Sequence, residues 1–220
     1  MRQIKTDEQV NTGDRKLAER DWGESARRAV VRVTSGGRGF IVHSKEGPMI
    51  VTAAHCLPKL PSAHPMRHLN EKTYENILGP LSVDEPTLWA ECLYVDPMAD
   101  VAVLAGPDSQ EYDDKYEAFI FWVEEVPPLQ VSQRDPRDGE RAWLLSLDAQ
   151  WEVCQVQVVG RRRMFLRTSG AGIAAGMSGS PILLDDGTVI GLVSLSCNAM
   201  QPRVSECLPN WILRQLTVCP

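Results

Sequence analysis

The stretch Met49-Ile50-Val51-Thr52-Ala53-Ala54-His55-Cys56 places a histidine two residues after a predicted β-strand, at the start of a turn. An imidazole titrates near neutral pH, so it can accept a proton and return it. A position just past a strand would hold the ring at the edge of the β-sheet. His55 is therefore the candidate general base. The alternative is a buried histidine with satisfied hydrogen bonds.

Asp100 is the candidate that would orient this histidine. It opens the apolar segment Val101-Ala102-Val103-Leu104, which places a carboxylate at the edge of a buried surface. Such a carboxylate orients an imidazole and stabilises its cation without being protonated itself. Asp96 is the alternative, but Pro97 follows it and the site is typical of a turn.

Ser178 is the candidate nucleophile, in the segment Gly176-Met177-Ser178-Gly179-Ser180-Pro181. A serine hydroxyl needs an adjacent base to take its proton during attack. Glycine at 176 permits an unusual backbone conformation, so the N–H groups of Gly176 and Ser178 can form an oxyanion hole. Ser180 precedes a proline at the start of a strand, which favours a packing role for it.

The chain order His, Asp, Ser excludes one large class of hydrolases. The α/β-hydrolases have their triad in the order Ser, acid, His, and their nucleophile lies in G-x-S-x-G. Ser180 stands where that motif requires its second glycine. The pattern therefore indicates a triad on a different fold.

Composition limits the function classes further. The chain has 220 residues, 43% of them hydrophobic, and a formal net charge of −6 at pH 7, which is typical of a soluble globular protein. A negative net charge does not favour binding to nucleic acid. No apolar run approaches the roughly 18–20 residues that span a membrane. The N-terminus lacks the apolar core of a signal peptide, so we expect a cytoplasmic location.

The six cysteines, at positions 56, 92, 154, 197, 207 and 219, are expected to be reduced. An even number would suit disulfides in a secreted protein, but no secretion signal is present. Cys56 beside His55 resembles a metal-binding pair. Because no second ligand pair follows at zinc-finger spacing, we expect no metal and no cofactor.

Short β-rich segments separated by turns predict an all-β fold of two packed antiparallel barrels. The predicted strands cover residues 29–34, 39–42, 49–52, 89–95, 101–104, 142–146 and 151–159, followed by a hairpin at 181–194 with a D-G turn. Residues 57–88 are predicted to be a long surface excursion and residues 107–118 a solvated acidic loop. Residues 209–216 predict a short C-terminal helix.

These elements divide the chain into four parts. Residues 1–24 form a polar N-terminal arm, and residues 25–123 form the barrel that carries the histidine and the aspartate. Residues 124–140 are an inter-barrel linker rich in proline. Residues 141–220 form the barrel that carries the serine, with the terminal helix.

The three segments together resemble the trypsin-like serine peptidases. Residues 52–56 resemble their histidine box, whereas residues 39–42 and 100–104 resemble the bacterial HtrA-type and glutamyl-endopeptidase-type branches, and residues 176–181 are similar to the serine box of the latter. The resemblance covers residues 29–216. It implies a chymotrypsin-like fold of two six-stranded barrels, a cleft between them, endopeptidase activity and no metal.

Two departures from the family bear on activation and specificity. Animal trypsins have an acidic residue at the position of Met177, and it pairs with a newly cut N-terminus. The resemblance places the primary pocket at residues 171–176, with Ile173, and along the strand Val193-Ser194-Leu195-Ser196. No acidic residue lies between Thr168 and Met177, which disfavours cleavage after Lys or Arg and favours a small or medium apolar residue.

We therefore expect a serine endopeptidase that acts on a protein or peptide substrate through an acyl-enzyme at Ser178. The glycine-rich loop before the serine is compatible with a latent enzyme that an activating or regulatory protein partner switches on. The alternative is a catalytically silent trypsin-like fold that serves as a protein-binding module. Neither nucleic acid nor a membrane is an expected partner.

Overall fold

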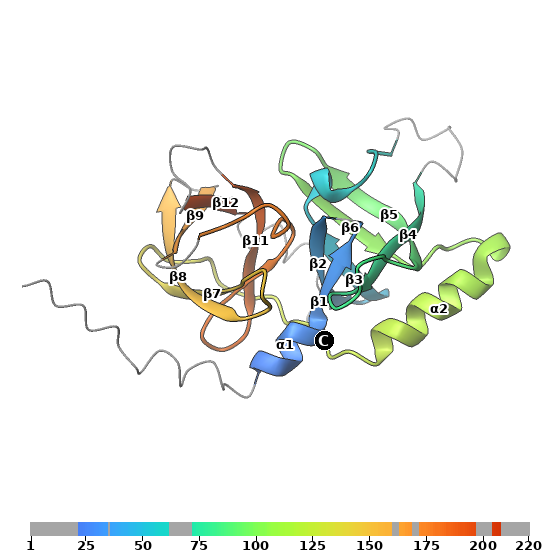
Figure 1. Ribbon diagram of the computed structural model, residues 1–220, viewed down its shortest axis with the longest axis horizontal. Helices are drawn as coiled ribbons and strands as arrows, with labels where there is room; N and C mark the ends of the chain where they lie inside the picture. Colours follow the sequence, from blue (N-terminus) through green and yellow to red (C-terminus); the bar gives the residue numbers. More distant parts are fainter. Residues whose placement is uncertain are drawn as a thin grey trace, which may run out of the picture.

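The chain forms two β-barrels that lie side by side (Figure 1). The computed structural model describes residues 22–34, 36–61, 72–159, 163–168, 172–196 and 204–207. The first barrel contains β1 (Val30–Val33), β2 (Gly37–Ser44), β3 (Gly47–Thr52), β4 (Thr73–Pro80), β5 (Leu88–Asp96) and β6 (Val101–Ala105). The second contains β7 (Arg141–Leu145), β8 (Trp151–Val159), β9 (Arg163–Thr168), β10 (Pro181–Leu183), β11 (Val189–Ser196) and β12 (Val204–Cys207).

Both sheets are antiparallel and curl into rings. In the first, the strand order is β1-β2-β3-β6-β5-β4, and β1 pairs with both β2 and β4. In the second, five strands curl in the order β9-β8-β7-β10-β11, and the short β12 pairs with β9 and β11. The predicted two-barrel fold is confirmed as mostly β. The C-terminal helix predicted at residues 209–216 lies outside the described residues.

The two barrels share a packed core. Phe40 and Ile41 of β2 belong to the same buried cluster as Trp143 and Leu145 of β7. The linker crosses between the barrels and makes one isolated bridge to each, at Leu129 with β2 and at Val131 with β11. Burial of this apolar surface fixes how the two barrels meet.

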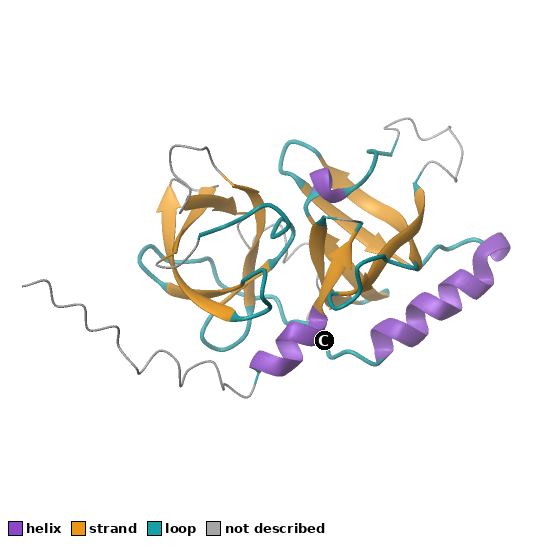
Figure 2. Cartoon of the chain, viewed as in Figure 1, coloured by secondary structure: helices purple, strands orange, loops and turns teal. Residues whose placement is uncertain are grey.

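Two helices lie outside the barrels, α1 (Gly23–Ala29) and α2 (Asp113–Glu124), as Figure 2 shows. We predicted a solvated loop at 107–118, and this was wrong for the part that α2 occupies. Only two of the twelve residues of α2, Phe119 and Val123, are buried. Because the other ten are partly or fully exposed, the sequence shows no clear helical pattern of apolar residues here. These two residues, four apart, lie on one side of the helix and pack against the first barrel.

The strand β4 lies within the segment that we predicted to be a surface excursion. Its buried residues are Tyr74, Ile77 and Leu78. Asn76 between them has a left-handed backbone with φ of 50°, and the pairing with β5 shifts register at this point. The bulge breaks the alternation of apolar and polar residues by which a strand is recognised in a sequence.

The helix α1 precedes the first barrel but is held by the second. Trp22, at its start, packs edge-on against Trp143 and Trp151, with ring centroids 6.2 and 5.5 Å apart. The indole of Trp151 donates to the Gly23 carbonyl over 2.8 Å, and that of Trp22 donates to the Asp185 carbonyl over 3.1 Å.

Within the described part of the chain, no helix is long and apolar enough to cross a membrane.

Candidate active site

His55 and Asp100 meet at the end of the first barrel. His55 lies in a short 3-10 turn, η2 (Ala54–Cys56), directly after β3, and Asp100 directly precedes β6. These strands are neighbours in the sheet, so the two residues face each other. The His55 Nδ1 atom lies 2.8 Å from one Asp100 carboxylate oxygen, and the His55 backbone N–H donates to the other over 3.0 Å.

The turn before Asp100 is held by the residue that we weighed against it. Asp96 accepts hydrogen bonds from the backbone N–H groups of Met98 and Ala99 over 2.9 and 3.0 Å. Asp100 itself has a left-handed backbone with φ of 54°, a conformation that aspartate adopts more readily than most residues. Asp96 thus has a turn-forming role, and Asp100 is the carboxylate that reaches the histidine.

Ser194 of β11 adds a contact that sequence reasoning missed. Its hydroxyl donates to the Asp100 oxygen that also contacts His55 Nδ1, over 2.6 Å. We had assigned Ser194 to the substrate pocket because of its place in the strand. A single serine hydroxyl carries no sequence signal for this role, since the contact joins residues 94 positions apart on different barrels.

The loop that carries Ser178 is bonded to both barrels. The Arg38 backbone N–H on β2 donates to the Ser178 carbonyl over 2.8 Å, and the Gly179 N–H donates to the Val193 carbonyl over 2.7 Å. Gly179 has φ of +83°, and a Cβ there would lie 1.8 Å from the Arg38 carbonyl oxygen. Only glycine permits this close approach between the loop and β2.

The predicted oxyanion hole consists of the backbone N–H groups of Gly176 and Ser178. Gly176 has φ of +91°, and among the described residues the N–H groups of Gly176 and Ser178 have no backbone acceptor. Met177 is buried, and its thioether sulfur accepts from the Ala174 N–H over 3.3 Å. A buried methionine thus holds the loop at the position where animal trypsins have an acid.

Among the described residues, the side chains of His55 and Ser178 are not hydrogen-bonded to each other. The loop of Ser178 nevertheless contacts Cys56, which follows His55 in the chain. The Cys56 thiol lies 3.6 Å from the Ser178 carbonyl oxygen. The His55 side chain is 41% exposed, so substrate can reach it, whereas that of Asp100 is 15% exposed. Catalytic hydrogen bonds of free enzymes often tighten only when substrate binds.

Cys56 faces Gly37. A Cβ built on Gly37 would lie 2.5 Å from the Cys56 sulfur, so the thiol fills the space above this residue. Burial raises the pKa of the Cys56 thiol to about 11, so it is protonated at neutral pH. Cys56, Cys92 and Cys154 are all free and buried.

Arg38 links the loop of Ser178 to the second barrel. Its buried guanidinium donates to the carbonyl oxygens of Leu145 and Ser146 over 2.8 and 3.0 Å, and lies 3.5 Å from the Ser180 hydroxyl. Burial and, to a smaller extent, the charge of Arg32 lower the pKa of Arg38 to about 10. Sequence reasoning missed this residue because its partners are backbone carbonyls more than 100 positions away.

The other residues predicted to bind substrate have different positions. Ile173 and Val193 are buried in the core of the second barrel. Leu195 and Ser196 belong to the strand β11, but their side chains lie outside the described set.

Among the described residues, no group of three His, Cys, Asp or Glu side chains is arranged to hold a metal ion.

The family comparison agrees with this architecture. The trypsin-like peptidase domain matches residues 37–192, which is most of the chain, so the protein belongs to the family of trypsin-like peptidase domains. The match spans both barrels and includes His55, Asp100 and Ser178. The chain is therefore a peptidase-family protein with a chymotrypsin-like fold.

Two solved structures show the same fold. The inactive form of the Rv3671c protease is 17% identical, with a TM-score of 0.59 over 91% of this chain and 92% of that one. The active form of the Rv3671c protease from M. tuberculosis is also 17% identical, with a TM-score of 0.60 over 93% and 88% of the two chains. No curated protein sequence matches the chain.

Proposed function

We propose that this protein is a serine endopeptidase with Ser178 as nucleophile, His55 as general base and Asp100 as the carboxylate that orients the base. The observation that carries the proposal is the double contact of Asp100 with the backbone and the ring of His55. An ionised carboxylate can only accept hydrogen bonds, so Nδ1 of His55 must carry the ring proton. The other ring nitrogen, Nε2, is then free to accept a proton.

The reaction follows from these positions. Ser178 Oγ attacks the scissile carbonyl carbon, its proton passes to His55 Nε2, and the negative charge on the carbonyl oxygen is stabilised by the Gly176 and Ser178 N–H groups. His55 then gives the proton to the leaving amine, which departs and leaves an acyl-enzyme. Water, deprotonated by the same histidine, hydrolyses this ester and restores Ser178.

The edge of β11 is the proposed binding strand for the substrate residues before the cleaved bond. Strand addition supplies main-chain hydrogen bonds that do not depend on side chains. We propose a small or medium apolar residue directly before the bond, since no acidic residue lies between Thr168 and Met177.

Regulation is part of the proposal. Gly176 and Gly179 both have positive φ, so the nucleophile loop depends on conformations that glycine leaves easily. We propose a cytoplasmic enzyme whose activity towards a dedicated protein target is set by a partner that orders this loop. Full activity of the isolated chain on generic peptides would remove the need for such a partner.

Fluorophosphonate labelling followed by intact-mass measurement tests the catalytic proposal. The wild-type chain should gain a single adduct, and Ser178→Ala should gain none. Removing a triad serine typically lowers kcat by about 10⁶-fold, so the contrast with Ser180→Ala, which keeps the nucleophile, should be large. Labelling of Ser178→Ala to the same extent as the wild type would contradict the assignment.

A further inference from the structure

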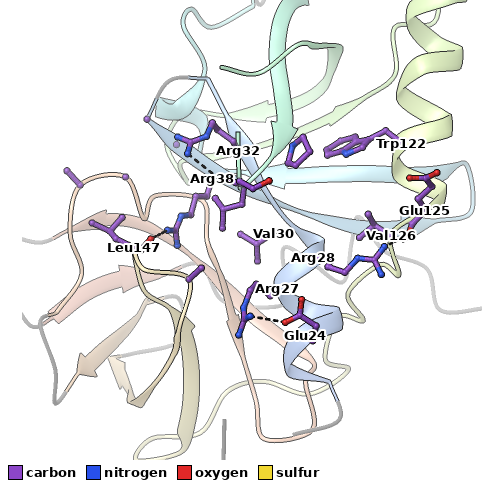
Figure 3. Close-up of a pocket in the computed structure, with 18 residues that line it drawn as sticks. Glu24, Arg27, Arg28, Val30, Arg32, Arg38, Trp122, Glu125, Val126 and Leu147 are labelled. Carbon is purple, nitrogen blue, oxygen red and sulfur yellow. Dashed lines mark hydrogen bonds and ion pairs between the residues drawn. The ribbon is translucent and has the colours of Figure 1, made fainter. Parts of the chain in front are cut away.

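A large cavity opens beside the nucleophile loop. Its volume is about 970 Å³, at the upper end of the roughly 300–1,000 Å³ of ordinary ligand pockets. Ala175 and Gly176 of the loop line it, together with Gly36 and Gly37 at the start of β2. The other walls come from α1, β1, the end of α2, the end of β4 and the turn after β7 (Figure 3).

The walls of this cavity carry an excess of positive charge. Four arginines line it, Arg27, Arg28, Arg32 and Arg38, against two glutamates, Glu24 and Glu125. The whole chain has a net charge of −6, so this concentration of arginine contrasts with the rest of the protein. Among the described residues, the arginines of the cavity form one ion pair, between Arg27 and Glu24.

Two of these arginines oppose each other directly. Arg32 of β1 and Arg38 of β2 are cross-strand partners in the first barrel, an arrangement that is unfavourable for like charges. Arg38 is already bonded to carbonyl oxygens, whereas the Arg32 side chain makes one long hydrogen bond to the described residues, 3.3 Å to the Leu81 carbonyl. The charge of Arg32 also contributes to the lowered pKa of Arg38. An anion in the cavity would relieve this repulsion.

Unused donors point to the same conclusion. The Nε atoms of Arg27 and Arg32 are buried and have no hydrogen-bond partner among the described residues. A buried donor without a partner is unfavourable, and guanidinium groups bind carboxylates with short, charge-assisted hydrogen bonds. Trp122, Val126 and Leu147 add apolar surface that would hold the stem of an acidic side chain.

The position of the cavity indicates which part of a substrate enters it. Gly176 marks the site of the scissile carbonyl, and the proposed binding strand β11 lies on one side of it. No described residue of β11 lines the cavity, which extends instead from Gly176 along Gly36 and Gly37 to α1. The cavity therefore faces the leaving-group side of the cleaved bond.

We propose that this cavity binds acidic side chains of the substrate on the C-terminal side of the cleaved bond, with Arg32 as the principal contact. The inference rests on the proposed peptidase function and names its substrate class. The enzyme would cleave before acidic segments, and Arg27 and Arg28 would bind carboxylates farther from the bond.

The test uses two quenched fluorescent peptides of a sequence that the enzyme cleaves, with either glutamate or glutamine at the two positions after the bond. For the wild type, kcat/KM should be about 10-fold to 100-fold higher with glutamate, as expected for a charge-assisted hydrogen bond. Arg32→Gln should bring the ratio near one, and Arg32→Lys should restore part of it. Arg137→Gln is the matched control, because Arg137 is exposed and outside the cavity.

A second measurement needs no activity. Ser178→Ala should bind a fluorescein-labelled glutamate peptide more tightly than its glutamine counterpart, and the added Arg32→Gln change should abolish the difference. Equal rates and equal binding of the two peptides, with normal fluorophosphonate labelling, would overturn the substrate inference and leave the peptidase function intact. Absence of both labelling and cleavage, for the isolated chain and for the chain in a cell lysate that could supply an activating partner, would overturn the proposed function, and the substrate role would fall with it.

Discussion

Ser194 of the second barrel donates a hydrogen bond to the Asp100 oxygen that contacts His55 of the first, so it supports the carboxylate that orients His55 in the proposed mechanism. The oxygen-to-oxygen distance is 2.6 Å, within the range of about 2.5–2.7 Å for a charge-assisted hydrogen bond from a hydroxyl to a carboxylate. Ser194 is buried, so water cannot easily replace it. In the proposed mechanism it is a positioning residue that acts through Asp100.

Ser194→Ala should therefore lower kcat more than it changes KM. Losing one hydrogen bond to a charged group costs about 1.5–3 kcal/mol, which corresponds to roughly a tenfold to hundredfold decrease in rate. Steady-state kinetics on one peptide would measure it. Ser44→Ala, at the β2–β3 turn, is the control with an equal change of side chain. A variant with unchanged kcat and pH profile would contradict the role of Ser194.

Asp100→Asn should remove the negative charge of this side chain while keeping the left-handed backbone conformation of the residue. Asparagine adopts the left-handed conformation of this position as readily as aspartate, so folding should be retained. The amide can stabilise the wrong ring tautomer of His55 and carries no negative charge, so kcat should fall about 10⁴-fold. Thermal unfolding close to that of the wild type, with activity lost, is the expected pair of results. Retained activity would exclude Asp100 as the orienting residue.

Gly179→Ala should disrupt the loop that carries the nucleophile. The new Cβ would lie 1.8 Å from a backbone oxygen of Arg38, and backbone cannot move aside as a flexible side chain can. We expect a loss of more than about 4 kcal/mol in the free energy of unfolding.

Gly47→Ala provides the control for this change. Gly47 also has positive φ, at 121°, but a Cβ there meets nothing within 4 Å. It should therefore show only the cost of the backbone conformation, about 1–2 kcal/mol. Urea unfolding of the two variants would separate steric clash from strain, and equal losses would contradict the proposed close approach.

Trp22→Ala should loosen α1 from the second barrel. Trp22 contacts two other tryptophans and donates a hydrogen bond to the Asp185 carbonyl, so removing its indole leaves a gap between helix and barrel. We expect a decrease of about 2–4 kcal/mol in the free energy of unfolding. Phe121→Ala, at a residue of α2 that is 71% exposed, should change stability by less than about 0.5 kcal/mol. Similar effects of both variants would argue against docking through Trp22.

Stability should decrease at alkaline pH. Burial raises the pKa of Cys56 and Cys92 to about 11 and that of Cys154 to about 12. In the unfolded chain these thiols ionise near pH 8.5, so between this pH and about 11 the unfolded state binds fewer protons than the folded state. The free energy of unfolding is therefore unaffected below about pH 8 and falls as the pH rises further.

Urea unfolding under reducing conditions at pH 7.5 and pH 10 would measure this dependence. Each thiol should contribute a loss of about 2 kcal/mol at the higher pH. The Cys56→Ala/Cys92→Ala/Cys154→Ala variant should show a smaller difference between the two pH values, whatever its stability at pH 7.5. A difference as large as that of the wild type would assign the effect to other groups.

The strands that sequence reasoning found are those with simple patterns. The hairpin around Asp185-Asp186-Gly187 was predicted from its turn residues, and β10 and β11 lie on either side of it. The strand β4 and the helix α2 were missed, the first because a bulge at Asn76 interrupts its alternation and the second because only Phe119 and Val123 are buried. Local patterns reveal an element only when the element is regular and its buried face is wide.

The sequence by itself determined the family, the two-barrel fold and the three candidate catalytic residues, because each lies in a short segment whose chemistry and spacing can be read locally. Only the tertiary structure decided that Ser194 bonds to Asp100, that Arg38 joins the nucleophile loop to the second barrel, and that four arginines line one cavity. These contacts join residues far apart in the chain. No local pattern encodes them, because they form only when burial of the shared core brings the two barrels together.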